Sequence, residues 1–193
     1  MAFKDDLKYL IECLRRDQAC GGIGSSFFLL RSLWNPCYSV LFTFRIGTFF
    51  KKYRLLYPLF VIVFLWHRYN TYKTGIQINF GTPIQPGLTF AHFGAIVINP
   101  KVQIGKNVLL YQGVTLGSQR GGKKCGAPKI GNNVIISSGA KVIGNVSIGD
   151  NAMVGANAVV VKDVPANAIV AGVPAKVLNL EAKEYIKDYI IIE

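Results

Sequence analysis

Histidine and cysteine are scarce in this 193-residue sequence, and their scarcity removes several classes of site. The chain holds two histidines and four cysteines, and no two cysteines form a Cys-x-x-Cys pair. A disulfide framework and a zinc site are therefore disfavoured, and we expect no metal. A reducing cytoplasm fits these cysteines, and the amphipathic N-terminal segment MAFKDDLKYLIE is unlike a signal peptide.

Acidic residues are also few. Ten Asp and Glu stand against 22 Lys and Arg, which gives a formal net charge of +12 at pH 7. We expect no nucleic acid partner, because no nucleic-acid-binding motif accompanies the charge.

Long apolar runs are absent as well. The run Leu55–Trp66 is about a dozen residues and contains Pro58, whereas a spanning helix needs about 20. Basic and aromatic residues surround it. Two interpretations stay open for residues 38–72, a buried helical core or a peripheral contact with the inner face of a membrane.

An aliphatic residue recurs every sixth position in the second half of the chain, with a small or β-branched residue four places later. Neither a helix nor a simple strand has this period, which is typical of a solenoid. One phase comprises Ile98, Ile104, Leu110, Leu116, Ile130, Ile136, Val142, Ile148, Val154 and Val160. The companion slot comprises Val102, Val108, Val114, Val134, Ala140, Val146, Ala152, Ala158 and Val164.

A hexapeptide repeat predicts a parallel β-helix. Three units form a triangular coil of about 18 residues, and stacked coils bury the aliphatic slots in one column. Turn positions at the corners are filled by Gly105, Gly131, Gly144, Gly149, Gly155, Asn107, Asn133, Asn145, Asn151 and Asn157. These residue types suit tight bends and positive φ.

Two breaks interrupt the repeat. The step from Phe90 to Ile98 is eight residues instead of six, and this insertion carries His92. Fourteen residues separate Leu116 from Ile130, so the glycine-rich, basic segment GSQRGGKKCGAP, residues 117–128, is expected to leave the stack as a flap.

The expected organisation is mainly β with helical ends. Residues 1–75 form an α-helical N-terminal region, with helices at 3–20, 26–33, 36–52 and 55–72. His67 is expected on a helix surface. Residues 76–177 form the β-helix. Residues 178–193 contain a closing helix at 181–191, which is expected to cover the last coil or a neighbouring subunit.

Three steps along the phase return to the same face of the prism. This count places His92 in one column with Gln112, Ser138 and Ala156. The small residues leave a groove for a long, thin ligand of the shape of a pantetheine arm. A histidine at the end of this groove suits the role of general base for an attacking hydroxyl.

Residues 76–177 resemble the hexapeptide-repeat acyltransferases, most closely the serine acetyltransferase-like branch. HFGAIVIN resembles the histidine motif of that branch, LYQGVTLG the following coil, and AGVPAKV the exit motif. The N-terminal region ending in YKTGIQI is similar to that of short members of surface-polysaccharide biosynthesis. The resemblance implies a left-handed β-helix and a homotrimer with active sites between subunits, and leaves open whether trimers pair.

The resemblance also implies direct attack of an acceptor hydroxyl on acetyl-CoA. His92 would be the base, and N–H groups of Gly117 or Ser118 would stabilise the oxyanion or the thiolate. Gln77 stands where the branch has a histidine-orienting aspartate, and Gln112 is a candidate acceptor-binding residue. The CoA groove would be lined by Ser138, Gly139, Lys141, Ala156, Lys162 and Lys176.

Three positions depart from the pattern of true serine acetyltransferases. Ala91 replaces an aspartate before the histidine, and Gly126 and Ala127 replace an Arg-His pair that grips the serine carboxylate. Leaving a buried ammonium and carboxylate unpaired is costly. We therefore expect a sugar hydroxyl of a surface-polysaccharide precursor as acceptor, with L-serine as the alternative. A non-catalytic scaffold would explain the repeat but not the insertion at His92.

Overall fold

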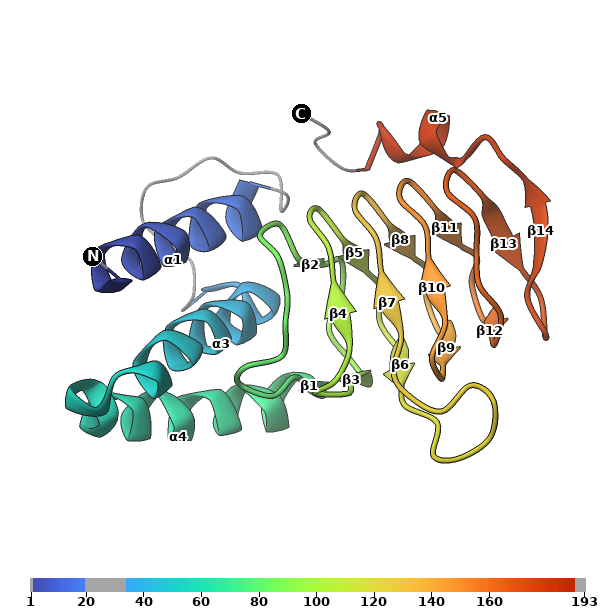
Figure 1. Ribbon diagram of the computed structural model, residues 1–193. Coiled ribbons are helices and arrows are strands. Elements are labelled where there is room, and N and C mark those ends of the chain that lie inside the picture. The colour runs from blue at the N-terminus through green and yellow to red at the C-terminus, as the bar shows by residue number, and fades with distance from the viewer. Residues whose placement is uncertain (1, 20–33, 190–193) are drawn as a thin grey trace.

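The computed structural model describes residues 2–19 and 34–189, which form a group of helices at one end of a three-sided prism of strands (Figure 1). The helices are α1 (Ala2–Ala19), α3 (Pro36–Lys52), the 3-10 turn η1 (Arg54–Leu56) and α4 (Tyr57–Thr74). The helix expected at 26–33 lies outside the described residues. Asn35 caps α3 by accepting a hydrogen bond from the Tyr38 N–H at 3.1 Å.

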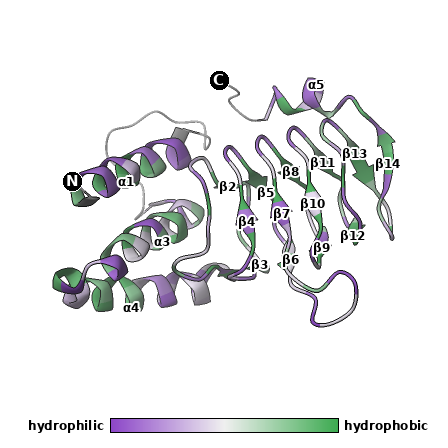
Figure 2. Cartoon of the chain, viewed as in Figure 1, coloured by the Kyte–Doolittle hydropathy of each residue, from purple (hydrophilic) through white to green (hydrophobic). Residues whose placement is uncertain are grey.

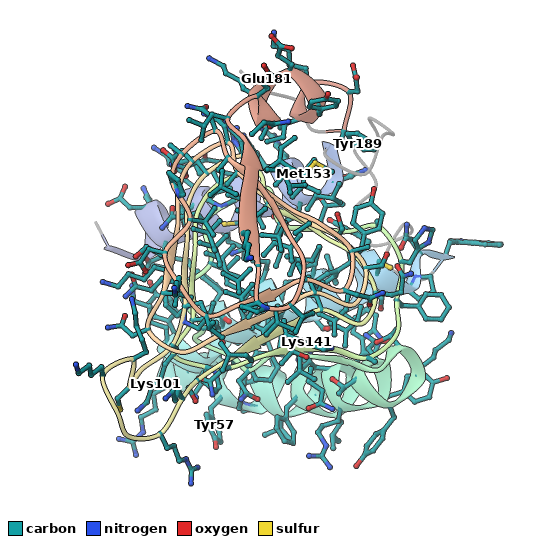
Figure 3. The ribbon with its side chains drawn as sticks, turned by 90° about the vertical axis from the view of Figure 1, so that its right-hand side faces the viewer. Tyr57, Lys101, Lys141, Met153, Glu181 and Tyr189 are labelled. Carbon is teal, nitrogen blue, oxygen red and sulfur yellow. The ribbon has the colours of Figure 1, made fainter. Side chains whose placement is uncertain are left out.

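Short strands form the three sides of the prism, and all of them except β14 pair in parallel, as the hexapeptide repeat predicted. Sheet A contains β1 (Ile76–Gln77), β3 (Ile96–Ile98), β6 (Thr115–Gly117), β9 (Lys141–Ile143) and β12 (Val159–Val160). Sheet B contains β4 (Gln103–Ile104), β7 (Lys129–Ile130) and β10 (Ser147–Ile148). Sheet C contains β2 (Thr89–Phe90), β5 (Leu109–Leu110), β8 (Ile135–Ile136), β11 (Met153–Val154), β13 (Ile169–Ala171) and β14 (Lys176–Asn179). Figure 3 views this prism along its axis.

The aliphatic column fills the prism. Every residue of both predicted slots is buried, so the period of six identifies the core of the coils correctly. At the N-terminal end, Val40, Leu41 and Phe44 of α3 belong to the same core. Helix α3 therefore closes the first coil, whose apolar interior would otherwise face water.

Asparagine and glycine have different structural roles at the corners of the prism. Asn107, Asn133, Asn151 and Asn157 adopt positive φ between 53° and 55°, as predicted. Three of them, with Asn167, form a ladder of amide hydrogen bonds of 3.0 to 3.2 Å from coil to coil. Gly105 instead allows close stacking, because a Cβ there would lie 2.6 Å from the Gly131 carbonyl oxygen.

The C-terminal helix α5 (Ala182–Ile186) lies along the flank of sheet C, not over the end of the prism (Figure 1). Its buried Ala182 and Ile186 pack with Leu109 and Ile135, which face outward from sheet C. The expectation that this helix covers the last coil was therefore wrong, and its alternative, a neighbouring subunit, stays a prediction. The last coil instead pairs with β14, which runs antiparallel to β13.

His67 is buried, so its expected place on a helix surface was also wrong. Only 5% of the residue is exposed. Nε2 lies 2.9 Å from the Ile78 carbonyl oxygen, which can only accept, so Nε2 carries the proton. Nδ1 then accepts from the Thr43 hydroxyl at 2.9 Å. The histidine thus ties α4 to α3 and to the first coil.

A buried ion pair joins the helices to the first coil. Arg45 of α3 donates to both carboxylate oxygens of Asp17 in α1, at 2.8 and 3.2 Å. Arg45 also donates to the carbonyl oxygens of Ile84 and Gln85, and Asp17 accepts from the N–H groups of Gly87 and Leu88. The remaining polar atoms of the pair are thereby satisfied.

Candidate active site

The two-residue insertion places His92 on the outside of the prism. Strand β2 stays in register as far as Ala91, whose N–H donates to the Leu110 carbonyl oxygen at 3.0 Å. The chain then bulges, with positive φ at Gly94 and Ala95, before β3 begins at Ile96. The His92 side chain is exposed. It lies at the corner between sheets C and A, where an acceptor can reach it.

The pairing of the coils brings the predicted column together at this corner. The Gly113 N–H donates to the Gly94 carbonyl oxygen at 2.8 Å, which joins the bulge to the next coil. Two further bonds continue the ladder, from the Gly139 N–H to Gln112 and from the Asn157 N–H to Ser138. His92, Gln112, Ser138 and Ala156 therefore mark successive coils of one edge.

Tyr111 is a neighbour of His92 that the sequence analysis did not identify. The ring centroids of the two residues are 6.2 Å apart and the rings are inclined by 59°. Burial, and then the nearby Tyr189 after α5, raise the pKa of the Tyr111 hydroxyl. The signal in the sequence was its position directly before Gln112 in the column. Tyr111 also packs against the cluster that α5 covers.

Gly117 and Ser118 lie at a different corner of the same chain. Gly117 ends β6 and Ser118 follows it, beside Asn99, whose side-chain amide donates to the Ser118 hydroxyl at 3.0 Å. Asn99 follows β3, whereas His92 precedes it. The length of one side of the prism thus separates His92 from these N–H groups, and one chain does not bring them together.

The flap, residues 117–128, leaves the stack from this second corner (Figure 1). It forms a small hairpin in which Gln119 and Gly126 exchange two backbone hydrogen bonds. Lys124 binds it to the coils, with its carbonyl oxygen accepting from Asn145 and its ammonium 3.2 Å from Asp163. Lys162, expected in the CoA groove, precedes Asp163 at this corner and is exposed.

Lys141 and Lys176 occupy different environments. The Lys141 ammonium donates to the Gly113 carbonyl oxygen and to the Thr115 hydroxyl, so it is already engaged by the neighbouring coil. Lys176 is exposed on β14, where it pairs with Ala171 at the far end of the His92 column. Lys176 is therefore the better placed of the two cations for a phosphate.

Gln77 forms no hydrogen bond with His92 in the part of the chain that the structure describes. It is exposed on β1 and lines a hollow of about 310 Å³ together with Arg68 and Tyr72 of α4. Within residues 2–19 and 34–189, no group of three His, Cys, Asp or Glu side chains could hold a metal ion.

Comparisons with known proteins match both the repeat and the whole fold. Residues 127–162 match the family model "Bacterial transferase hexapeptide (six repeats)". A serine acetyltransferase of Staphylococcus xylosus is 39% identical over 132 residues, which cover 67% of this chain and 60% of that protein. One of Staphylococcus aureus strain Mu50 is 45% identical over 112 residues, covering 57% and 52%. This chain thus spans 60% or less of the length of these two curated relatives.

Solved structures agree over most of the chain. Neisseria gonorrhoeae serine acetyltransferase in complex with serine has a TM-score of 0.72 at 26% identity, covering 91% of this chain and 72% of that one. A serine acetyltransferase in complex with CoA also has a TM-score of 0.72, at 25% identity, with 92% and 73% covered. The predicted mainly β, left-handed parallel β-helix with helical ends is thereby confirmed.

The same relatives contradict the sugar acceptor expected from the sequence. These four relatives and structural neighbours are all named as serine acetyltransferases, which favours the alternative acceptor, L-serine. The expectation was wrong because it rested on missing groups. Ala91, Gly126 and Ala127 remove charges that would pair with an amino acid, but they supply nothing that binds a sugar. The repeat, the prism and the relatives together place the chain in the hexapeptide-repeat acyltransferase family, on its serine acetyltransferase-like branch.

Proposed function

We propose that the chain is an acetyl-CoA-dependent O-acetyltransferase that acetylates the hydroxyl of L-serine. The observation that carries the proposal is the exposed His92 at the end of the column formed by Gln112, Ser138 and Ala156. The names of the relatives support the reaction and its acceptor. The relative solved in complex with CoA supports the donor.

The proposed reaction needs no acyl-enzyme. His92 removes the proton of the serine hydroxyl while the oxygen attacks the thioester carbonyl carbon. The C–O bond forms, the tetrahedral oxyanion collapses, and the C–S bond breaks. The thiolate of CoA leaves and takes the proton from the imidazolium. Ser118 lies outside β6, so its N–H is the better of the two proposed donors to the oxyanion.

We propose a homotrimer, because the proposed groups lie at different corners of one chain. The corner with His92 and the corner with Ser118 are separated by one side of the prism. A neighbouring prism that turns its flap corner toward the His92 column would bring them together. A closed ring of such contacts repeats the same site in every subunit. Whether two trimers pair is a separate question of assembly.

Binding of CoA would follow the His92 edge. Gly139 has no side chain and Ala156 has only a methyl group, so both leave room for a ligand along this edge. Lys176 at its far end suits a phosphate. Arg120 and Lys123 of the flap are exposed and remain for the serine carboxylate, since Gly126 cannot take over the role of an arginine. Its φ of 132° and the 3.0 Å from an added Cβ to Asn145 oppose any larger residue.

We also propose a cytoplasmic location. The exposed Cys125 and the other free cysteines suit a reducing compartment. Of the two open interpretations of residues 38–72, the buried core applies to α3, much of which is buried. The buried-core interpretation does not apply to α4, in which only His67, Asn70 and Thr74 are buried.

Replacement of His92 by alanine tests the proposed mechanism. We expect acetyl transfer to L-serine, followed as release of CoA thiol, to fall by about 10²- to 10⁴-fold, as is typical for loss of a general base. The melting temperature should not change, because His92 is exposed. His67→Gln is not a suitable control because His67 is buried, so Lys106→Ala, on the exposed turn between β4 and β5, serves instead. Unchanged turnover in His92→Ala would rule out the mechanism.

The acceptor is tested separately. L-serine, D-serine, L-threonine and O-methylserine are compared at saturating acetyl-CoA. Thiol release with L-serine but not with O-methylserine supports hydroxyl acetylation. A rate with L-serine no greater than hydrolysis in its absence would rule out serine as the acceptor.

A further inference from the structure

The outward half of α4, with the preceding η1, is an apolar surface that nothing in the described chain covers. Exposed fractions reach 91% for Leu55, 64% for Ile62 and 62% for Leu65. We call this surface the α4 face. It comprises Leu55, Tyr57, Leu59, Val61, Ile62, Phe64, Leu65, Tyr69 and Tyr72. Figure 2 shows hydrophobic residues on α4 at the outer edge of the molecule, and in Figure 3 Tyr57 projects away from the body.

The fold does not need this surface to be apolar. The inward half of α4 makes the contacts that hold the helix, through the buried His67, Asn70 and Thr74. Asn70 donates to the Ser39 carbonyl oxygen, and Thr74 to that of Asn70. A surface helix usually turns polar residues to water. Here the residues that α4 buries fully are polar, whereas most of its exposed surface is apolar, which favours an apolar partner outside the chain.

All charged residues of η1 and α4 are positive. Arg54 precedes the α4 face, Arg68 lies on its border, and Lys73 follows it; all three are exposed. No Asp or Glu occurs anywhere in the sequence between Asp17 and Asp150. Local repulsion would therefore not hinder an anionic partner, whereas a basic one would be repelled.

The apolar residues of the α4 face require a partner with an apolar interior, and the cations around it favour a partner with an anionic surface. An anionic lipid bilayer has both properties. A second copy fits less well, because a two-fold contact between α4 faces would bring Arg54, Arg68 and Lys73 together without a counter-charge. Among the described helices, none is long and apolar enough to cross a membrane. Tyr57, Tyr69 and Tyr72 belong to the face, and tyrosine is enriched at the headgroup level of membranes.

We propose that the α4 face binds the surface of an anionic phospholipid bilayer, with α4 lying in the plane of the interface. Leu55, Ile62 and Leu65 insert among the acyl chains, and Arg54, Arg68 and Lys73 contact the lipid phosphates. This proposal does not depend on the acetyl transfer proposed above.

Co-sedimentation of the full chain with vesicles tests the proposal. The wild-type protein should bind vesicles that contain phosphatidylglycerol more tightly than vesicles of phosphatidylcholine alone. The double variant Ile62→Glu, Leu65→Glu should lose more than about a hundredfold in affinity, because it removes two inserted side chains and adds two repelled charges. The matched control is Leu178→Glu, Leu180→Glu, whose side chains on the far end of the prism are 65% and 61% exposed. It should bind as the wild type does.

The cations are tested on the same vesicles. Arg68→Gln and Lys73→Gln should each lower affinity for phosphatidylglycerol vesicles about fivefold and leave binding to phosphatidylcholine unchanged. Circular dichroism checks that each variant folds. No vesicle binding by the wild type, or equal binding by both double variants, would overturn the proposal. A change of oligomeric state in Ile62→Glu, Leu65→Glu without a loss of vesicle binding would assign the face to a second copy instead.

Discussion

Ala91 is the residue at which a substitution is expected to strengthen the binding of the proposed acceptor, L-serine. It lies next to His92 and is half-buried at the edge of the cluster under α5. A carboxylate there would pair with the serine ammonium. We expect Ala91→Asp to lower the KM for L-serine by about tenfold or more, the gain of a charge-assisted hydrogen bond, with a smaller change in kcat.

Steady-state kinetics at fixed acetyl-CoA measure this change. The control Ala91→Asn has nearly the same volume without the charge, and its KM should stay near that of the wild type. If both variants lower KM equally, the effect is one of shape, and pairing with an ammonium is not its cause.

His67 makes folding stability depend on pH. Burial, the leading cause, lowers the pKa of its imidazole, although the hydrogen bond to Ile78 opposes the shift. The unfolded chain takes up a proton near the ordinary histidine value of about 6.5, while the native state does so only at lower pH. The contribution of neutral His67 to folding stability is therefore fully present above this value, and it is lost as the pH falls toward the native pKa.

Melting temperatures between about pH 7.5 and pH 5 check this prediction. The wild type should become less stable as the pH falls. His67→Gln keeps a donor and an acceptor but does not titrate, so its curve should be flatter. A wild-type slope in His67→Gln would assign the pH dependence to other groups.

At the scale of elements, the ion pair of Asp17 and Arg45 holds α1 and α3 against the first coil. Asp17→Asn leaves the guanidinium buried without its counter-charge. We expect unfolding by urea to show a loss of about 3–5 kcal/mol, the usual cost of breaking a buried pair on one side. Glu12→Gln removes the exposed pair with Arg16 on the same helix and should cost less than about 1 kcal/mol. Equal losses would show that burial of the pair has no special weight.

The coils could be predicted because their signal is local and repeated. Every slot of the period of six requires a buried apolar side chain, so a wrong assignment at one position does not change the predicted fold. The place of α5 was not predicted, although a signal existed. In sheet C the outward residues Leu109, Ile135, Met153 and Ile169 are apolar, whereas in sheet B the corresponding residues are Gln103, Lys129 and Ser147. An apolar outer face requires a cover.

The candidate site was only partly predictable for a related reason. Counting along the repeat places His92 on the same edge as Ser138 and Ala156, because the register is fixed by the buried slots. Counting does not say which corners of different prisms meet. The roles of Gln77 and Ser118 came from the resemblance alone, and in the single chain Ser118 lies at another corner of the prism than His92. The prediction for His67 was wrong because the sequence around it does not indicate its hydrogen-bond partners, Thr43 and Ile78.

At the scale of the whole molecule, the proposed site between subunits predicts complementation. His92→Ala supplies an intact flap, and a variant lacking residues 120–125 supplies an intact His92. Each should be inactive alone. Unfolded together and refolded, they should form mixed trimers in which about one third of the sites join an intact His92 to an intact flap.

Thiol release by the refolded mixture measures the recovery, and each variant refolded alone is the control. Size-exclusion chromatography with light scattering checks that mixed species are trimers. Recovery confined to mixtures supports a site shared between chains. A mixture of folded trimers without activity would mean that each chain must supply both groups.

Strand β14 sets a limit on the growth of the molecule. A stack of parallel coils ends in unpaired N–H and C=O groups that match the first strand of another stack. In sheet C that edge is occupied by a strand of reversed direction, with a register shift between Ile169 and Val170. Helix α3 fills the opposite end. In sheet C one prism therefore offers no matching template to the next, which opposes the end-to-end growth into fibres that a stack of identical coils would otherwise permit.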